Sequence, residues 1–248
     1  MTFAVTQVQQ GRGAWTSVGG LLSVDGRSRG PYYRAPSDGS FARMPGATTV
    51  MAIRNNVTVD VNTYAVYMGV RACQRQIGVV DDGVWGSNTD AAAKRWQAQM
   101  GYALVGVADG VIGPRSTKGM FLPDVNKACG SNNDLRYAVV GHMGHESGWD
   151  PAAVGMSTPD DLGLGQINGV YHPEMSPAAR LTPEQAIPWM VSFVQGNLEA
   201  LGNLDDGIAA YLLGIGGARS WVRAGRPQIF YKADIPAYIR SVHTAAEA

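Results

Sequence analysis

Glu146 is the residue of this sequence best placed to do acid–base chemistry. It ends a stretch in which apolar residues such as Leu135, Val139 and Met143 recur at helical spacing, and Trp149 follows closely. A carboxyl group beside an aromatic ring, at the end of a buried helix, loses hydration, and this loss raises its pKa. It then stays protonated near neutral pH, as a general acid must. An exposed glutamate at a helix end is the alternative that this segment alone leaves open.

Two further segments carry groups that suit a sugar substrate. Residues 161–168 read DLGLGQIN, in which Asp161 offers a second carboxylate, Gln166 offers an amide to a sugar and Asn168 is a further candidate contact. Residues 210–214 read AYLLG and contain Tyr211, and GGARSW follows at 216–221. The glycines in both segments permit a close approach of the backbone to a ligand.

Together these segments resemble the lysozyme-like lytic transglycosylases of the soluble type. That family has Glu-Ser near the end of its first helix, then Gly-Leu-x-Gln, then Ala-Tyr-Asn-x-Gly. The resemblance implies that Glu146 is the catalytic acid, that Ser147 is its neighbour, and that Gln166 and Tyr211 bind substrate. It also implies that the substrate is peptidoglycan, cut at the β-1,4 bond between N-acetylmuramic acid and N-acetylglucosamine, with no cofactor and no metal.

The sequence departs from that family pattern at two positions. Leu212 stands where Asn is usual, which removes a polar group near the expected site, and Gly165 stands where Met is frequent. Because of these two departures, a catalytically decayed, wall-binding structural protein is an alternative, although Glu146 and Gln166 are both intact.

Trp149 and Asn168 complete the set of expected substrate-binding residues.

Asp161 decides between two chemistries. With Glu146 alone, the enzyme protonates the glycosidic oxygen and then acts as base on the sugar's own 6-hydroxyl, which gives a 1,6-anhydro product. The pattern Asp-x-Gly-x-x-Gln-Ile-Asn is also similar to the segment of animal-type lysozymes that carries their second carboxylate. With a working Asp161, water becomes the acceptor and the product is a reducing sugar. We expect the transglycosylase outcome and keep the hydrolytic lysozyme as the alternative.

A repeated pattern precedes the catalytic segments. Residues 82–89 (DGVWGSNT) and 109–117 (DGVIGPRST) share Asp-Gly-x-x-Gly followed by Thr, and a helix with Trp96 and Gln97 lies between them. Such a repeat is one supersecondary unit used twice. The pattern resembles small helical peptidoglycan-binding domains, and this resemblance implies wall contacts by Asp82, Trp85 and Asp109.

The predicted fold class is mainly α. We expect an irregular or β-rich segment at 1–58, a helical peptidoglycan-binding domain at 59–122, a linker at 123–130 and a lysozyme-like helical catalytic domain at 131–248. Within the last of these, helices are expected to begin at 131 or 132, at 183 after a Thr182 capping box, at 205 or 206, and at 236.

Charge and composition restrict the class of protein and the place where we expect it to act. Lys plus Arg and Asp plus Glu both number 20, which argues against a general nucleic-acid binder. The start of the chain lacks the charged and apolar regions of a signal peptide, and no apolar run reaches the ~20 residues of a membrane span. Residues 1–58 are rich in Arg. We therefore expect a bacteriophage product, either a lysin released to the host wall or periplasm, or a virion part anchored to other tail proteins by residues 1–58.

A zinc amidase is the sharpest alternative to a glycosidase. His142 and His145 lie on one predicted helix face, and His172 could be a third ligand. The order His142-Met-Gly-His145-Glu matches neither known zinc helix motif, and the other segments require no metal. We therefore expect ordinary helix and loop roles for these histidines.

Overall fold

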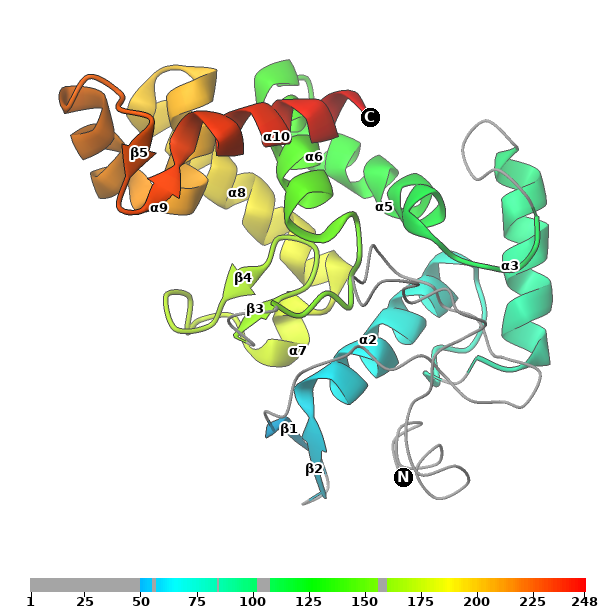
Figure 1. Cartoon of the computed structure of the whole chain (residues 1–248). Helices are drawn as coiled ribbons and strands as arrows, with labels where there is room; N and C mark the ends of the chain where they lie inside the picture. The colour runs from blue at the N-terminus through cyan, green and yellow to red at the C-terminus, as the bar shows by residue number, and fades with distance from the viewer. Residues whose placement is uncertain (1–49, 55–56, 84, 102–107, 156–159) are drawn as a thin grey trace. The chain divides into compact units, whose positions relative to one another are not determined.

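The computed structural model describes residues 50–54, 57–83, 85–101, 108–155 and 160–248 (Figure 1). These residues are mainly helical, as the sequence predicts, and their strands form two-stranded pairs only. The elements in chain order are β1 (Val50–Arg54), β2 (Val57–Asp60), α2 (Val61–Gln76), α3 (Ser87–Met100), α5 (Pro114–Cys129), α6 (Asn133–Ser147), β3 (Asp161–Leu162), β4 (Ile167–Asn168), α7 (Pro177–Arg180), α8 (Pro183–Leu201), α9 (Leu204–Arg223), β5 (Ile229–Phe230), β6 (Ala233–Asp234) and α10 (Ile235–Glu247).

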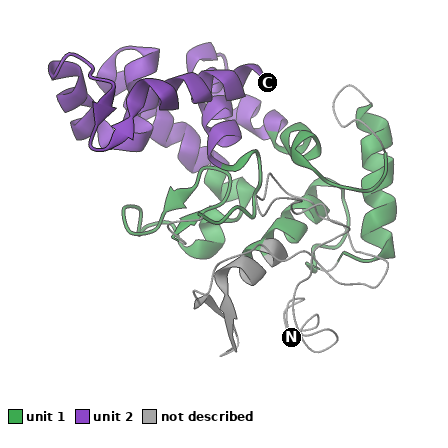
Figure 2. Cartoon of the chain, viewed as in Figure 1, with its two compact units in different colours: residues 1–121, 147–186 green, residues 122–146, 187–248 purple. Residues whose placement is uncertain are grey.

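The chain divides into two compact units that cut across the expected domain boundaries (Figure 2). The first unit joins residues 1–121 to residues 147–186, and the second joins 122–146 to 187–248. The predicted boundary near 131 therefore does not separate the units. Residues 147–186, expected in the catalytic domain, group with the repeat segment instead.

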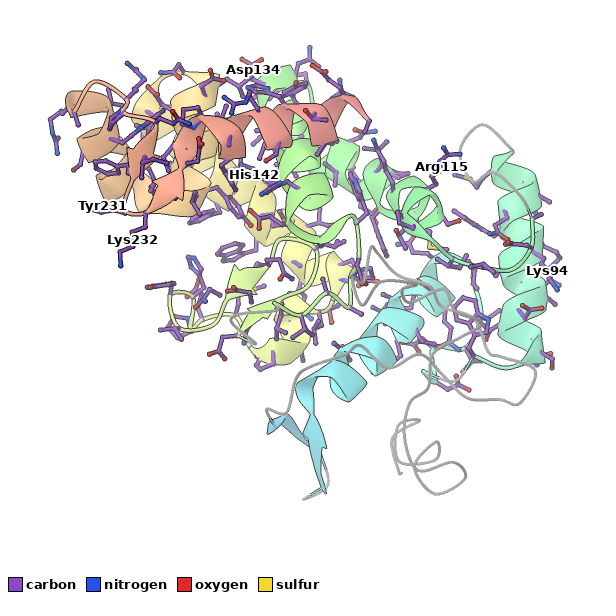
Figure 3. All side chains as sticks on the ribbon, viewed as in Figure 1. Lys94, Arg115, Asp134, His142, Tyr231 and Lys232 are labelled. Carbon is purple, nitrogen blue, oxygen red and sulfur yellow. The ribbon has the colours of Figure 1, made fainter. Side chains whose placement is uncertain are left out.

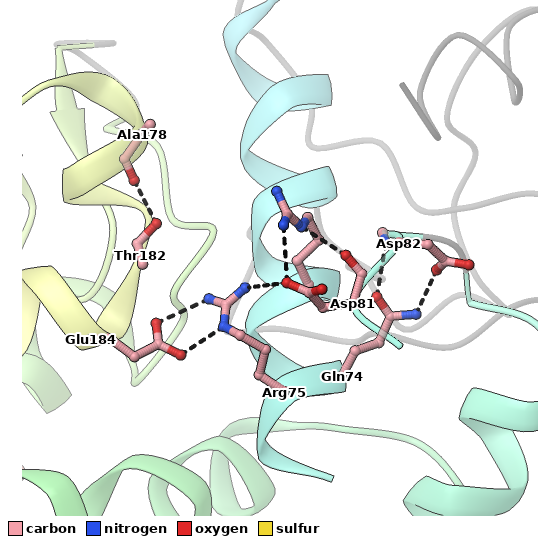
Figure 4. A network of polar contacts seen from close by, with 9 residues as sticks. Gln74, Arg75, Asp81, Asp82, Ala178, Thr182 and Glu184 are labelled. Carbon is pink, nitrogen blue, oxygen red and sulfur yellow. Dashed lines mark hydrogen bonds and ion pairs between the residues drawn. The ribbon is translucent and has the colours of Figure 1, made fainter. Parts of the chain in front are cut away.

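A bidentate ion pair in the first unit shows why these two stretches belong together. Arg75 on α2 donates from Nε and Nη2 to the two carboxylate oxygens of Glu184, at 2.7 and 3.0 Å. Its Nη1 also lies 3.1 Å from Oδ2 of Asp81, which accepts a second hydrogen bond from Arg71 (Figure 4). A forked arginine–carboxylate contact fixes direction as well as distance. Because Arg75 and Glu184 are 109 residues apart in the sequence, no local sequence pattern could have predicted their contact.

The predicted repeat is present in the first unit as a repeated hydrogen bond. The side-chain oxygen of Gln74 accepts from the amide of Gly83, and that of Gln97 accepts from the amide of Gly110, both at 2.8 Å. Both glutamine side chains are buried. Both glycines have positive φ, 76° and 82°. The turn after each Asp therefore depends on a buried amide from the preceding helix and on a residue without a β-carbon.

The expected linker at 123–130 is wrong. Residues 123–129 continue α5, and Pro123 lies inside this helix. A proline in a helix interior costs about 3 kcal/mol. Phe121 and Val125 have no solvent exposure, and each fully buried side chain of this kind contributes about 1.5–3 kcal/mol. Burial on either side of Pro123 thus outweighs the cost of the proline.

A short hairpin in the first unit carries most of the motif at 161–168. Its strands β3 and β4 pair Asp161 with Asn168 and Leu162 with Ile167. The buried guanidinium of Arg180, at the end of α7, donates to the backbone carbonyls of Asp160 and Ile167. One side chain therefore holds both sides of the hairpin.

In the second unit, α6 and α10 pack closely because α6 has glycines at the contact. A β-carbon on Gly141 would lie 2.6 Å from the carbonyl oxygen of Val242, and one on Gly144 would lie 2.9 Å from the Cβ of Ala245. The predicted helix starts are confirmed within one or two residues. Asn132 caps α6 by accepting from the amide of Leu135 at 3.0 Å, which is a normal N-cap contact.

Helix α9 bends at Gly214, where φ is 67°. Near the start of α9 lies Asp206, and just after its end lies Arg226. Because the helix bends between them, Arg226 donates to both carboxylate oxygens of Asp206 at 2.9 and 2.7 Å. The side chain of Asp206 is only 4% exposed. Gly214 closes the segment predicted at 210–214, so its conformational freedom sets the direction of the chain after Tyr211.

The N-terminal segment is described only in part. The described part of the segment expected to be irregular or β-rich contains the antiparallel pair β1 and β2, with a register shift between Val50 and Ala52. The virion-anchor expectation concerns residues 1–58, of which 1–49 and 55–56 lie outside the described residues. Among the helices that the structure describes, none combines the length and apolar character of a membrane span.

Gly163 gives a stability prediction. Its φ is 74°, and a β-carbon there would lie 2.0 Å from the carbonyl oxygen of Arg180. Gly202 has φ 76° with nothing within 4 Å of the same position. We expect Gly163→Ala to lower the free energy of unfolding by about 3 kcal/mol or more, and Gly202→Ala by about 1 kcal/mol, because only the first adds a backbone clash to the strained φ.

Chemical denaturation of the two variants checks this prediction. Equal losses would mean that the hairpin moves away from Arg180 without cost, and that the close approach at Gly163 does not constrain the loop.

Candidate functional site

Glu146 lies near the C-terminal end of α6, and the residue as a whole is half-buried. The hydroxyl of Tyr238, on α10, donates to Oε1 of Glu146 at 2.7 Å. This distance is ordinary for a hydroxyl donor. The contact joins residues far apart in the sequence, and both belong to the second unit.

A buried imidazole continues this contact. Nδ1 of His142 lies 3.2 Å from the hydroxyl oxygen of Tyr238. His142 is one helical turn before Glu146 and has no solvent exposure; its place on α6 is labelled in Figure 3. Three side chains, His142, Tyr238 and Glu146, thus form a continuous hydrogen-bonded chain that ends on the carboxyl group.

The two side chains that lead to Glu146 in this hydrogen-bonded series, His142 and Tyr238, are both neutral near pH 7. Burial, and to a smaller extent the charge of His145, lower the pKa of His142 to about 3. Burial, and then Glu146, raise the pKa of Tyr238 well above its ordinary value. Near neutral pH the imidazole is therefore uncharged and the phenol keeps its proton. The group next to Oε1 of Glu146 is a neutral donor.

Aromatic rings extend from this chain along the second unit. The ring of Tyr211 stacks on His142 with centroids 4.2 Å apart, and Phe193 meets Tyr211 edge-on at 5.5 Å. Trp189 stacks on Phe193 at 4.9 Å, one helical turn earlier on α8. Of the predicted residues, Glu146 and Tyr211 are thus brought together in the second unit, with His142 and Tyr238 between them.

Four further predicted residues fall in the first unit, where they shape the hairpin loop: Ser147, Asp161, Gln166 and Asn168. The hydroxyl of Ser147 donates to the carbonyl of Leu164 at 2.9 Å. Gln166 has a positive φ of 47°, and its amide nitrogen donates to the carbonyl of Gly163 at 3.1 Å. Ser147 and Gln166 therefore both contribute to the conformation of the loop within the first unit.

Asp161 and Asn168 interact with each other. The amide nitrogen of Asn168 donates to Oδ1 of Asp161 at 2.6 Å, across the β3–β4 pair. Oδ1 of Asn168 accepts from the backbone amides of Val170 and Tyr171. The carboxylate of Asp161 thus orients a side chain that builds the next turn, which is a structural use of this group.

Two tryptophans predicted to bind ligand are core residues. Trp149 is 4% exposed and Trp85 is 1% exposed, so neither offers a face to a sugar. Both expectations are wrong, because a large aromatic residue next to a turn is as useful for packing as for binding. Lys118 lies 6.0 Å from the ring centroid of Trp149, also within the first unit.

Asp82 and Asp109 have local partners. Oδ1 of Asp82 accepts from Gln74 at 2.9 Å, and Oδ1 of Asp109 accepts from the backbone amide of Val111 at 2.8 Å. Both aspartates are exposed at the surface. Their observed contacts stabilise the repeated turns, and wall binding by them stays a prediction.

The histidines of the zinc alternative have other contacts. His142 contacts Tyr238, and Nδ1 of His145 lies 2.9 Å from the hydroxyl of Ser241. His172 lies 3.4 Å from Glu174 in the first unit. Across the residues that the structure describes, no group of three potential metal-binding side chains comes together.

Sequence reasoning missed Tyr238 and misjudged His142. The signal for His142 was available, because residues four apart lie on the same face of a helix and Glu146 follows at that spacing. Tyr238 had no such signal, since its contact with Glu146 depends on how α10 packs against α6. Neither a protein-family model nor a curated protein matches the sequence of this chain.

The buried His142 predicts a pH-dependent stability. An unfolded histidine binds a proton below about pH 6.5, whereas the folded side chain does so only below about pH 3. Between these values the unfolded state binds more protons, so stability falls as the pH falls, by up to about 1.4 kcal/mol per pH unit. His142→Asn should remove much of this slope between pH 6.5 and 4.5.

Urea denaturation of the parent protein and of His142→Asn across this range makes the comparison. His145, whose pKa burial also lowers, is present in both proteins and leaves a residual slope. Parallel curves would show that His142 takes up its proton in the folded protein as readily as in the unfolded chain.

Proposed function

We propose that this protein cleaves the glycan strands of bacterial peptidoglycan, with Glu146 as the acid that protonates the glycosidic oxygen. The bond cut is the β-1,4 bond between N-acetylmuramic acid and N-acetylglucosamine. The observation that carries the proposal is the hydrogen bond of 2.7 Å between the neutral phenol of Tyr238 and Oε1 of Glu146. The resemblance of three sequence segments to lytic transglycosylases supplies the substrate class.

The environment of Glu146 suits proton transfer. Glu146 is half-buried at the end of α6, so burial restricts its hydration while a substrate oxygen can still approach. Tyr238 fixes one carboxyl oxygen, and the neutral His142 behind it adds no positive charge.

The proposed reaction needs no second carboxylate. Glu146 gives its proton to the leaving O4 as the bond from C1 to O4 breaks. The 6-hydroxyl of the same sugar then attacks C1, and its proton returns to Glu146. The product carries a 1,6-anhydro ring, and the enzyme is restored. Because the nucleophile is already on the substrate, its effective concentration is high.

The local role of Asp161 favours this outcome over hydrolysis. Its carboxylate accepts a hydrogen bond from Asn168 at 2.6 Å, and the resulting pair builds the turn after β4. A hydrolytic lysozyme would use this carboxylate on water or on the sugar ring instead. Hydrolysis with Glu146 and Asp161 is the second candidate, because Asp161 lies in the segment that resembles animal-type lysozymes.

The setting that fits this activity is a bacteriophage product acting on the host wall. The repeated turns of the first unit resemble peptidoglycan-binding domains, and the Arg-rich segment 1–58 suits attachment to other virion proteins. The partner that we propose is therefore peptidoglycan, reached either from the virion or as a lysin in the periplasm.

Replacement of the acid tests the proposal directly. Glu146→Gln keeps the shape of the side chain and an oxygen that can accept from Tyr238, but it cannot give a proton. We expect the rate of wall lysis to fall about 100-fold or more, with the melting temperature and wall co-sedimentation little changed. Glu199→Gln is the matched control, because Glu199 is exposed and contacts only its neighbour Gln195 among the hydrogen bonds described.

Turbidity loss of purified peptidoglycan measures the rates. A folded Glu146→Gln protein that still clears the wall as fast as Glu199→Gln would remove Glu146 from the reaction.

Asp161→Asn separates the two chemistries. The substitution keeps an oxygen that can accept from Asn168 but removes the negative charge. If the transglycosylase account holds, lysis should stay within about fivefold of the parent rate, because the sugar's own hydroxyl needs no activation by Asp161. Anhydro ends should appear on the products of both proteins. Reducing ends from the parent protein, lost in Asp161→Asn, would make the enzyme a hydrolytic lysozyme.

A further inference from the structure

One nitrogen of the buried His142 has no hydrogen-bond partner among the residues that the structure describes. This atom, Nε2, is inaccessible to solvent, whereas Nδ1 lies 3.2 Å from the hydroxyl of Tyr238. A buried polar atom without a partner costs about 1–3 kcal/mol, so the position calls for an explanation. The ring is held on its other side by the stacked ring of Tyr211, 4.2 Å away.

The single proton of the phenol decides which nitrogen of His142 carries hydrogen. Tyr238 lies 2.7 Å from Oε1 of Glu146 and 3.2 Å from Nδ1 of His142. Its proton goes to the shorter contact, with the stronger acceptor, which is the carboxylate. The phenol oxygen can then only accept from Nδ1, so Nδ1 carries the hydrogen and Nε2 is the bare nitrogen. The unpartnered atom is thus an acceptor rather than an N–H group.

We propose that His142 is a positioning residue that, as the Nδ1–H tautomer, donates to Tyr238 and so commits the phenol proton to Glu146. This inference rests on the proposed function for its consequence in catalysis, but the tautomer itself is a property of the folded protein. Burial keeps the ring neutral, and the groups around it that titrate are Tyr211, Tyr238 and His145.

The direction of the hydrogen bonds determines which oxygen of Glu146 carries the acid proton. Oε1 accepts from Tyr238, so a proton on the carboxyl group belongs on Oε2. Without a donor behind it, the phenol oxygen could instead accept a proton held on Oε1, and the acid would then be turned toward α10. His142 disfavours this reversed arrangement, because a protonated Nδ1 cannot accept the phenol proton, which then has only the carboxyl group as its acceptor among the contacts described.

Nitrogen NMR of the full-length protein tests the tautomer without reference to activity. In a neutral imidazole, the protonated and bare nitrogens have well-separated ¹⁵N shifts, and long-range ¹H–¹⁵N correlations identify which is which. The chain has four histidines, and the signal lost in His142→Asn assigns His142. We expect Nδ1 protonated and Nε2 bare at pH 7. A spectrum with Nε2 protonated would overturn the proposal.

Two variants of similar size test the consequence for catalysis. Asn places an N–H near the position of Nδ1, whereas Leu offers no donor. We expect His142→Leu to lower kcat on purified peptidoglycan about tenfold, with KM unchanged, and His142→Asn to retain the parent kcat within about threefold. A packing defect alone would affect both variants and would not be rescued by Asn.

The outcomes separate this inference from the proposed function. Equal kcat for His142→Leu and the parent would overturn the positioning role. If His142→Leu does not fold, the parent spectrum and the His142→Asn rate still decide the question, since a loss of tenfold or more in the Asn variant contradicts the role of the N–H donor. If the spectrum is as expected but Glu146→Gln still lyses the wall, the proposed function fails while the tautomer stands.

Discussion

The hydrogen bond from Tyr238 to Glu146 is the contact around which the second unit is organised. It requires that the last helix of the chain lie against α6 at close range. Two glycines on α6, Gly141 and Gly144, make that approach possible, because a β-carbon at either position would lie within 3 Å of α10. Asn132 and Asp234 cap the two helices by accepting from the backbone amides of Leu135 and Ala237 in their first turns. Sequence features spread over more than a hundred residues therefore act on the position of one carboxyl group.

In the first unit, one buried side chain likewise fixes the position of a functional segment, but its hydrogen-bond acceptors are backbone carbonyls. The buried Arg180 binds two carbonyls of the hairpin, and Gly163 lies so close to Arg180 that only a residue without a side chain fits. Ser147 donates to the carbonyl of Leu164 in this loop. The ion pair of Arg75 with Glu184 then joins α2 to the start of α8. The residues of the 161–168 motif are thus held by contacts that serve the fold first.

Local patterns predicted the parts of the structure that local physics controls. The helical class, the starts of α6, α8, α9 and α10, and the repeated turns all follow from apolar spacing, caps and glycines. Pro123 misled the prediction because its cost is local and visible, whereas the burial of Phe121 and Val125 that outweighs it is not. The domain boundaries failed for the same reason, since the contact of Arg75 with Glu184 spans 109 residues.

In the candidate site, too, local sequence patterns indicate some residues, whereas others depend on long-range packing. Glu146 was predictable from its place at a helix end, and His142 could have been found from its spacing of four residues. Tyr238 could not, because its role arises from the packing of two helices. Trp149 and Trp85 were assigned to ligands although both are core residues, since composition alone does not distinguish a buried ring from an exposed one.

The mass of the soluble products that the unmodified protein releases from purified peptidoglycan shows which bond it cuts. Cleavage by Glu146 with the 6-hydroxyl as nucleophile predicts disaccharide-peptides that are one water lighter than their hydrolytic counterparts and that have no reducing end. Peptides released from intact glycan strands, or no soluble sugar at all, would contradict the claim that this protein cuts the sugar backbone.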